Sequence, residues 1–196
     1  MNVKKILKEA AILFVITLVS GLLLGFAYQV TKTPIAERQA REKREAYQGV
    51  FPDAADFAEE DTLNAKLGEA EAILSEAGVT GVAVNECLAA KDGSGQVLGY
   101  VMSLSFAGSQ GEITMAYGWA MDGSTMGIDI LQSSETANLG SLADEPEFKD
   151  QFAQNTEKFA LGDNIDQISG ATVTSDAVVN AANGGMAFAT ACAKGE

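Results

Sequence analysis

The feature that most constrains this chain is a run of 22 residues, 10–31, that contains no charged side chain. Residues 10–28 are almost wholly apolar, which is typical of a helix that crosses a lipid bilayer. At 1.5 Å per residue such a helix spans about 33 Å, close to the thickness of the hydrocarbon core. The run therefore predicts one transmembrane helix at residues 10–31.

A cleaved signal peptide is the alternative interpretation of this run, because Lys4, Lys5 and Lys8 precede it. Signal peptides have an apolar core of about 7–15 residues that is followed by a small-x-small cleavage site. Here the apolar core is longer, and Phe-Ala-Tyr-Gln at residues 26–29 offers no clear site. The sequence favours a retained anchor.

Charge alone leaves the orientation of this anchor open. Five Lys or Arg residues lie within residues 32–44, against three before the run. A count of basic residues would put the C-terminal side in the cytoplasm, but long domains cross the membrane largely regardless of charge. Three of the five also lie beside Glu37, Glu42 and Glu45, which weakens the count further.

Residues 32–78 predict a stalk and helical linker between the membrane and a folded domain. Thr33 and Pro34 suit the start of a helix, because proline fits the first helical turn. Residues 35–50 are charged and polar, with Glu and Arg at helical spacing, and predict a solvated helix. Residues 53–78 are acidic and rich in alanine, and predict short helices with loops.

From residue 79 onward, four segments have the character of strands and are separated by turns rich in Gly, Asp and Ser. A short helix is expected at residues 147–154 and a final helix at 176–193, which Gly184 and Gly185 weaken. The predicted fold class is α+β, with one antiparallel sheet packed by helices in a domain that covers residues 79–196. The expected strands are residues 82–88, 97–106, 113–120 and 126–131.

Composition excludes several classes of function. The net charge is −14, and residues 49–196 carry 23 Asp and Glu against 5 Lys and Arg, so the domain repels nucleic acid. The absence of histidine removes Ser-His-Asp catalysis and His-based metal sites. Two cysteines, Cys87 and Cys192, are too few for a four-thiolate iron–sulfur cluster. Two buried thiols are the simpler interpretation of this pair, and a disulfide stays open.

The strongest functional motif is the stretch Asp-Gln-Ile-Ser-Gly-Ala-Thr-Val-Thr-Ser at residues 166–175. Gly170 can take a backbone angle that a Cβ would forbid, so the stretch predicts a tight turn. Thr174 or Ser175 can cap a helix that begins near residue 176. Free N–H groups at a helix start also suit a phosphate, although an ordinary N-cap turn has the same composition.

The order Asp-x-x-Ser-Gly-Ala-Thr resembles the acceptor motif at which a flavin transferase joins FMN to a threonine through a phosphoester. The accepting residue in that family is the threonine directly after the alanine, here Thr172. The resemblance implies covalent FMN as the cofactor and a separate flavin transferase as a maturation partner. A threonine hydroxyl is a weak nucleophile until a base or a metal activates it, and this chain has no histidine.

A second motif, Glu-Thr-Ala-Asn-Leu-Gly at residues 135–140, follows the last expected strand. Alone it predicts a connecting loop in which Asn138 can take a left-handed backbone angle. With the threonine motif and Phe-Lys-Asp-Gln-Phe at residues 148–152, it resembles the Glu-Thr-Pro-Gly-Leu-Gly loop in the FMN-binding domain of the G subunit of the Rnf electron-transport complex. The C subunit of the Na⁺-translocating NADH:quinone reductase shares that domain. Ala137 and Asn138 replace Pro-Gly here, and the resemblance covers nearly the whole chain.

The resemblance implies a membrane-anchored flavoprotein subunit that relays electrons through FMN in an ion-translocating ferredoxin:NAD⁺ oxidoreductase complex. It places residues 1–9 in the cytoplasm and residues 32–196 on the extracytoplasmic side of the cell membrane, with the other subunits of the complex as partners. A non-redox binding module tethered to the membrane and a stand-alone extracellular FMN-binding reductase are the alternatives. No catalytic residue and no metal ligand is expected. The residues expected to bind FMN are Thr172, which carries it, and Glu135, Thr136, Leu139, Gly140, Asp166, Ser169, Gly170, Ala171 and Thr174.

Overall fold

The computed structural model describes residues 3–194, so residues 1 and 2 of the expected cytoplasmic segment 1–9 lie outside it. The chain divides into two compact units, Met1–Glu42 and Lys43–Glu196. The expected domain, residues 79–196, lies wholly within the second unit. That unit begins earlier than the strand pattern indicates, because the segments between residues 43 and 78 pack on the sheet.

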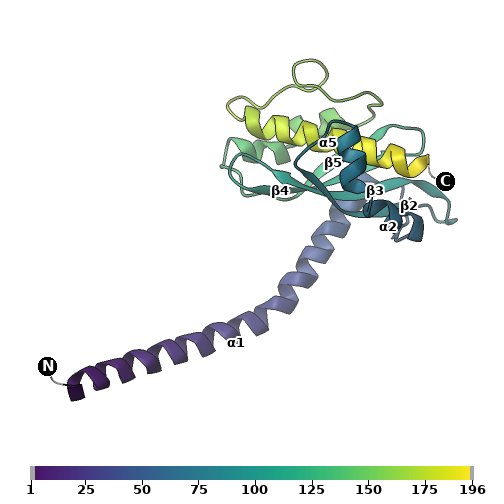
Figure 1. Cartoon of the computed structure of the whole chain (residues 1–196). Coiled ribbons are helices and arrows are strands. Elements are labelled where there is room, and N and C mark those ends of the chain that lie inside the picture. Colours follow the sequence, from purple (N-terminus) through teal and green to yellow (C-terminus); the bar gives the residue numbers. More distant parts are fainter. Residues whose placement is uncertain (1–2, 195–196) are drawn as a thin grey trace. The chain divides into compact units, whose positions relative to one another are not determined.

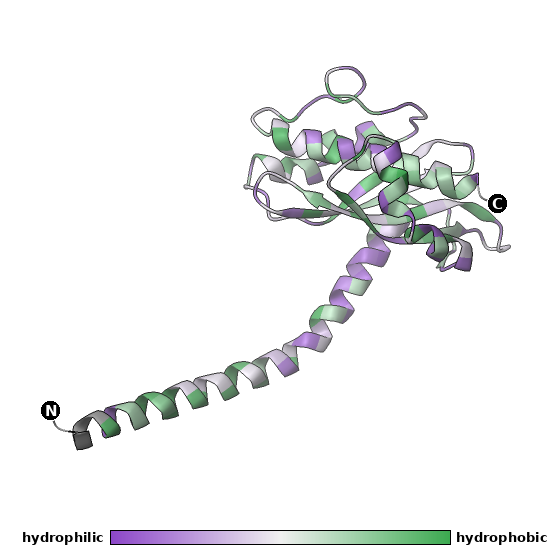
Figure 2. Cartoon of the chain, viewed as in Figure 1, coloured by the Kyte–Doolittle hydropathy of each residue, from purple (hydrophilic) through white to green (hydrophobic). Residues whose placement is uncertain are grey.

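The N-terminal helix α1 (Val3–Val50) contains the apolar run at residues 10–31. Within residues 3–194, α1 is the one helix that is long and apolar enough to cross a membrane. Figure 2 shows its N-terminal part as predominantly hydrophobic and the following turns as hydrophilic. The hydroxyls of Thr17 and Thr31 each donate to the carbonyl four residues earlier, at 3.1 and 2.9 Å. Such bonds satisfy side-chain polar groups where water is absent.

Pro34 lies inside α1, so the prediction that it starts a helix was wrong. Proline removes one backbone hydrogen bond but does not have to end a helix whose neighbouring turns are stable. Before Pro34 the helix is uninterrupted from Val3, and its residues 10–31 carry no charge. In the turns after it, Arg38 Nε donates to Glu42 Oε1 at 2.6 Å, one of the expected i,i+4 pairs.

The last turns of α1 are part of the core of the second unit, which corrects the expectation of a solvated helix at residues 35–50. Tyr47 donates its hydroxyl to Glu86 at 2.7 Å, and Lys43 pairs with the same carboxylate at 2.6 Å. The apolar positions follow the i, i+3, i+4 spacing of a helix face, but the charged residues around them hide that pattern. The buried side chains are Ala46, Tyr47 and Val50, with Phe51 just beyond the helix.

The second unit is built on a five-stranded antiparallel sheet in the order β1-β2-β3-β4-β5. The four expected strands are confirmed as β2–β5. The first strand was missed, because three residues are too few for an alternating pattern to be seen. The strands are β1 (Asp56–Ala58), β2 (Val82–Lys91), β3 (Val97–Ala107), β4 (Glu112–Ala120) and β5 (Thr125–Gln132).

The helices of the second unit pack against this sheet, and α5 lies across one face of it (Figure 1). In place of one helix at residues 147–154, the structure has α4 followed by a short 3-10 turn, η2. The expected final helix exists but begins at Thr172 rather than near residue 176. The elements are α2 (Asp61–Leu67), α3 (Ala70–Glu76), η1 (Gly140–Asp144), α4 (Pro146–Lys149), η2 (Asp150–Phe152) and α5 (Thr172–Ala193).

Alternation along β3 and β4 divides the core between the two faces of the sheet. The face beneath α5 carries large side chains, among them Tyr100 and Tyr117. The opposite face carries small residues where the end of α1 packs, including Ala116. A Cβ at Gly118 would collide with Val50, so the missing side chain makes room for α1.

The two glycines in α5 have a similar packing role. A Cβ on Gly185 would lie 2.7 Å from the ring of Tyr117, and one on Gly184 would lie 3.1 Å from Leu74 and from Val79. The glycines lower helix propensity, as the sequence indicates, but they let α5 approach the sheet and α3 closely.

Cys87 in β2 and Cys192 in α5 are both buried, and no disulfide joins them. A hydrogen bond with Cys192 and burial together raise the pKa of the Cys87 thiol. The interpretation as two buried thiols is therefore confirmed for this structure.

The substitution Gly185→Ala should destabilise the protein by about 1–3 kcal/mol, because the new methyl group overpacks the Tyr117 ring. Helix propensity alone predicts the opposite effect, a gain in stability of about 1 kcal/mol. Thermal unfolding of the full-length protein in detergent distinguishes the two. A raised midpoint would contradict the packing argument.

Candidate functional site

The threonine motif forms a tight turn that runs directly into α5. Gly170 has φ +79°, a left-handed backbone angle that glycine takes without steric cost. The N–H of Ala171 donates to the carbonyl of Ile168 at 3.0 Å and closes the turn. The first helical residue is Thr172, so the prediction that Thr174 or Ser175 caps the helix was wrong.

Ser175 fastens this turn to the first turn of the helix. Its buried hydroxyl accepts from the N–H of Ile168 at 3.0 Å and donates to the carbonyl of Ala171 at 3.1 Å. Both bonds lie within the turn and the first turn of α5, so this hydroxyl does not cap the helix from outside. The turn is thereby held in one conformation against α5.

Thr172 stands exposed at the first position of a 22-residue helix. The preceding residue, Ala171, has no polar side chain with which to cap the helix. Backbone N–H groups at such a terminus and the helix dipole favour a bound phosphate or another anion. The next residue, Val173, is 61% exposed and adds an apolar surface beside the hydroxyl.

The loop at residues 135–140 folds back on itself before η1 begins. The backbone carbonyl of Thr136 accepts a hydrogen bond from the N–H of Leu139 at 3.1 Å and another from the N–H of Ser141 at 3.2 Å. Asn138 has φ +59°, which confirms the left-handed angle expected for it. This conformation leaves Leu139 42% exposed.

Glu135 joins this loop to two other segments of the domain. Its Oε2 accepts from the hydroxyl of Thr174 at 2.9 Å, and its Oε1 accepts from the N–H of Gln110 in the turn between β3 and β4 at 3.0 Å. A Cβ on Gly108 or on Gly140 would collide with the carboxylate, so both glycines provide its space. Glu135 is therefore half-buried and directed inward, where it links the loop, the turn and α5.

A second contact brings the loop against the threonine motif. A Cβ on Gly170 would lie 3.2 Å from Leu139 Cδ2, which is closer than most side-chain contacts. Leu139 and Gly170, which are far apart in the sequence, therefore lie side by side next to Thr172. The structure brings the two sequence motifs together into one site.

The segment at residues 148–152 packs in the core and holds the start of the threonine motif. Phe148 and Phe152 are buried, and Phe152 also packs on the ring of Phe159. Between the two phenylalanines, Gln151 accepts from the N–H of Asp166 at 2.6 Å through its side-chain oxygen. The start of the threonine motif is thus tied to η2, while the carboxylate of Asp166 stays exposed.

The ten expected residues fall into two groups by exposure. Glu135, Gly140, Ala171 and Thr174 are partly or wholly buried and hold the site together. The other six, which face solvent, are Thr136, Leu139, Asp166, Ser169, Gly170 and Thr172. Sequence reasoning missed Gln110 and Gln151 as supports. Gln110 acts through its backbone N–H, which leaves no signal in the sequence.

These residues can hold a flavin mononucleotide. None of the ten is basic, so a phosphate here depends on the N–H groups at the start of α5 and on hydroxyls. The exposed apolar side chains suit one face of an aromatic ring. They are Leu139 and Val173.

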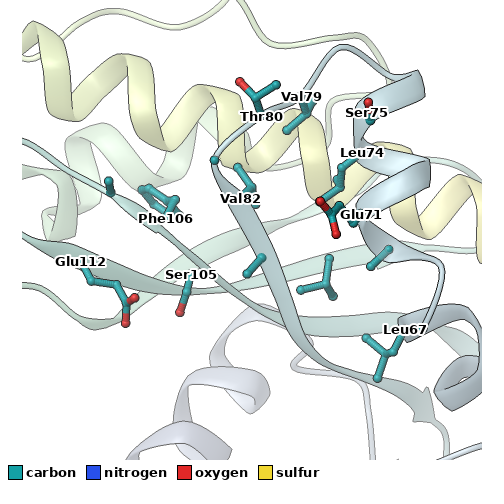
Figure 3. A pocket seen from close by; sticks show the side chains of 16 residues that line it. Leu67, Glu71, Leu74, Ser75, Val79, Thr80, Val82, Ser105, Phe106 and Glu112 are labelled. Carbon is teal, nitrogen blue, oxygen red and sulfur yellow. The ribbon is translucent and has the colours of Figure 1, made fainter.

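Two hollows in the second unit lie away from this site. The larger, about 800 Å³, lies beside α3 and β2 (Figure 3). The other, about 310 Å³, lies between the end of α1, β5 and α4. Neither is lined by a residue of the threonine motif or of the loop at residues 135–140. Thr172 itself is exposed, so a group bound to it would lie at the surface of the domain.

The substitution Thr174→Val should cost about 1–3 kcal/mol of stability, because it removes a donor from a half-buried carboxylate. Thr190→Val is the matched control in the same helix. Its hydroxyl bonds only to the carbonyl of Met186, four residues earlier, so its loss should have little effect. Urea unfolding of both variants measures the difference, and equal stability of the two would contradict the role assigned to Glu135.

Two family models match the chain, the FMN-binding domain over residues 108–187 and the RnfG N-terminal region over residues 1–50. Two solved structures resemble part of the chain. NqrC of Shewanella oneidensis has a TM-score of 0.46 at 21% identity, over 56% of this chain and 61% of its own. The C subunit of the Na(+)-translocating NADH-quinone reductase of Parabacteroides distasonis has a TM-score of 0.42 at 25% identity, over 53% and 62%.

Two relatives match almost from end to end. The G subunit of the ion-translocating oxidoreductase complex of Methanosarcina acetivorans is 33% identical over 195 residues, which cover 96% of each chain. The G subunit of the Na(+)-translocating ferredoxin:NAD(+) oxidoreductase complex of Acetobacterium woodii is 34% identical over 193 residues, 92% of this chain and 89% of its own. With both family models matched in the expected order, the chain belongs to the family of G subunits of Rnf-type ion-translocating oxidoreductase complexes.

Proposed function

We propose that this chain is the membrane-anchored flavoprotein subunit of an Rnf-type ferredoxin:NAD⁺ oxidoreductase complex, and that it carries FMN on Thr172 through a phosphoester. In this function the protein relays electrons between other subunits and has no activity of its own. The flavin supplies the redox chemistry, and the chain supplies its position and its electrostatic surroundings.

The observation that carries the proposal is the position of Thr172. Its hydroxyl is exposed at the start of α5, beside a helix terminus suited to a phosphate. The loop at residues 135–140 lies next to it through the contact of Leu139 with Gly170. An exposed hydroxyl is also what a separate flavin transferase needs, because the enzyme has to reach its acceptor.

The residues around Thr172 have different parts in this function. The N–H groups at the start of α5 bind the phosphate, and Leu139 and Val173 shield one face of the ring from water. Glu135 and Ser175 hold the two loops in place without contacting the reacting atoms. The site has no histidine to donate a proton, and the domain as a whole is acidic, which disfavours added negative charge on a reduced flavin.

The same proposal assigns a place in the cell. Residues 10–31 of α1 span the cell membrane once, residues 1–9 are cytoplasmic, and residues 32–196 lie on the extracytoplasmic side. The length and apolar character of α1 and the match to the RnfG N-terminal region support the anchor. A covalent bond to FMN has a clear benefit outside the cytoplasm, since dissociated flavin would be lost there.

The substitution Thr172→Ala should abolish covalent flavin while leaving expression and fold intact, since the side chain is exposed and such changes cost about 0.5 kcal/mol or less. The measurement is in-gel flavin fluorescence of denatured protein, with mass spectrometry of the peptide that contains Thr172. Thr172→Ser is the matched control, because it keeps a hydroxyl at the same helix position. Flavin that persists in Thr172→Ala, or that is found on Thr174, would refute the assignment.

The proposed orientation predicts that a cysteine introduced at Ala72 reacts with a membrane-impermeant reagent in intact cells. Ala72 is exposed on α3, whereas the two native thiols are buried and should react slowly. Asn2→Cys is the control for the other side of the membrane and should react only after the cells are opened. The reverse pattern would place the domain in the cytoplasm.

A further inference from the structure

We infer that the free edge of β2, together with the hollow beside it, is the docking site for an extended segment of another protein of the complex. The inference rests on the proposed function only in that it requires such a complex. The hollow is separate from the FMN site, and no residue of the threonine motif lines it.

The first observation is that most of β2 has a neighbour on one side only. Its partner β3 pairs with it from Val82 to Lys91, whereas β1 pairs only with residues 89–91 on the other side. Within residues 3–194, no strand continues that pairing along residues 82–88. Alternate residues of an antiparallel edge strand direct their N–H and C=O groups outward, where they can pair with a further strand.

The second observation is the hollow of about 800 Å³ that borders this edge. Figure 3 shows α3 on one side of β2, with Leu74 and Glu71 projecting into the space between them. Beyond β2, the ends of β3 and β4 complete the lining. The larger apolar side chains of the lining are Leu67, Leu74, Val79, Val82, Val84 and Phe106. A groove between a helix and an open strand edge is the geometry in which domains bind extended peptides by strand addition.

The third observation is the charge of the groove. Two carboxylates, Glu71 and Glu112, are among the residues that line it, and no Lys or Arg is among them. Both are exposed and lie on different elements, α3 and β4. The groove is therefore complementary to a segment that carries basic residues beside alternating apolar ones.

The edge also limits what can dock. A register shift between Val84 and Glu86 marks a β-bulge, which interrupts regular pairing and protects an edge from open-ended association. The regular stretch of the edge beside the hollow is therefore residues 82–84, which all line it, and the side chains of the groove provide the specificity. This combination selects a short extended segment of a defined partner rather than a helix or a long strand.

Hydrogen exchange tests the inference in the intact system. We compare the full-length chain in detergent with the same chain in the complex purified from native membranes. In the complex, the outward-facing amides of residues 82–84 should exchange at least about tenfold more slowly, because they become hydrogen-bonded. The amides of β5, at the opposite edge of the sheet, should not change.

Three variants connect any protection to the groove. Glu71→Lys reverses a charge of the lining, and Ser75→Trp fills the hollow from α3; each should remove the protection of residues 82–84. Glu76→Lys is the matched control, because Glu76 is exposed on the same helix but does not line the hollow. It should leave the protection unchanged.

Each other outcome overturns the inference. Protection of α3 without protection of residues 82–84 would mean that a helix or a small ligand occupies the groove. Protection in the isolated chain that rises with its concentration would assign the edge to a second copy. Unchanged exchange in a complex that contains the chain would remove the inference but not the proposed function. Failure to find the chain in any complex would refute the proposed function and, with it, the inference.

Discussion

The close approach of α5 to the sheet is the constraint on which the rest of the domain depends. Gly185 faces the Tyr117 ring without a side chain between them, and the Tyr117 hydroxyl bonds to Thr125 at 2.8 Å in β5. Any side chain at that position would push the helix away from the strands. Because Thr172 is the first residue of this helix, the packing of the core determines where the acceptor hydroxyl stands.

Glu135 connects the packed core of the domain to the loops at its surface. Both of its oxygens accept a hydrogen bond from a neutral donor, and two glycines leave it the space to do so. A carboxylate that is satisfied in this way resists displacement, because moving it would leave the buried hydroxyl of Thr174 without its acceptor. The loop next to Thr172 is therefore fixed, even though its own residues are mostly exposed. A rigid support beneath an accessible hydroxyl is consistent with the proposed modification of Thr172 by a separate enzyme.

The sequence was sufficient for those features that depend on local pattern. The apolar run, four strands, the α+β class and the left-handed angle at Asn138 follow from periodicity and residue type. The errors arose where tertiary packing overrides local preference. Pro34 lies within a helix that its neighbouring turns stabilise. Tyr47 is buried although the segment around it is rich in charged residues. The link from Glu135 to Gln110 was beyond prediction, because its donor is a backbone group.

One helix connects the proposed FMN site with the groove beside β2. The N-terminus of α5 carries Thr172, and farther along Gly184 packs against Leu74 and Val79, which line the groove. Between them, Asn180 donates from its side chain to the carbonyl of Thr80, in the turn that leads into β2, at 3.0 Å. A helix is stiff over this length, so a partner held at the groove also fixes the distance between itself and the threonine. Electron transfer without diffusion requires a fixed separation of this kind, and the domain provides it through backbone packing rather than through a mobile loop.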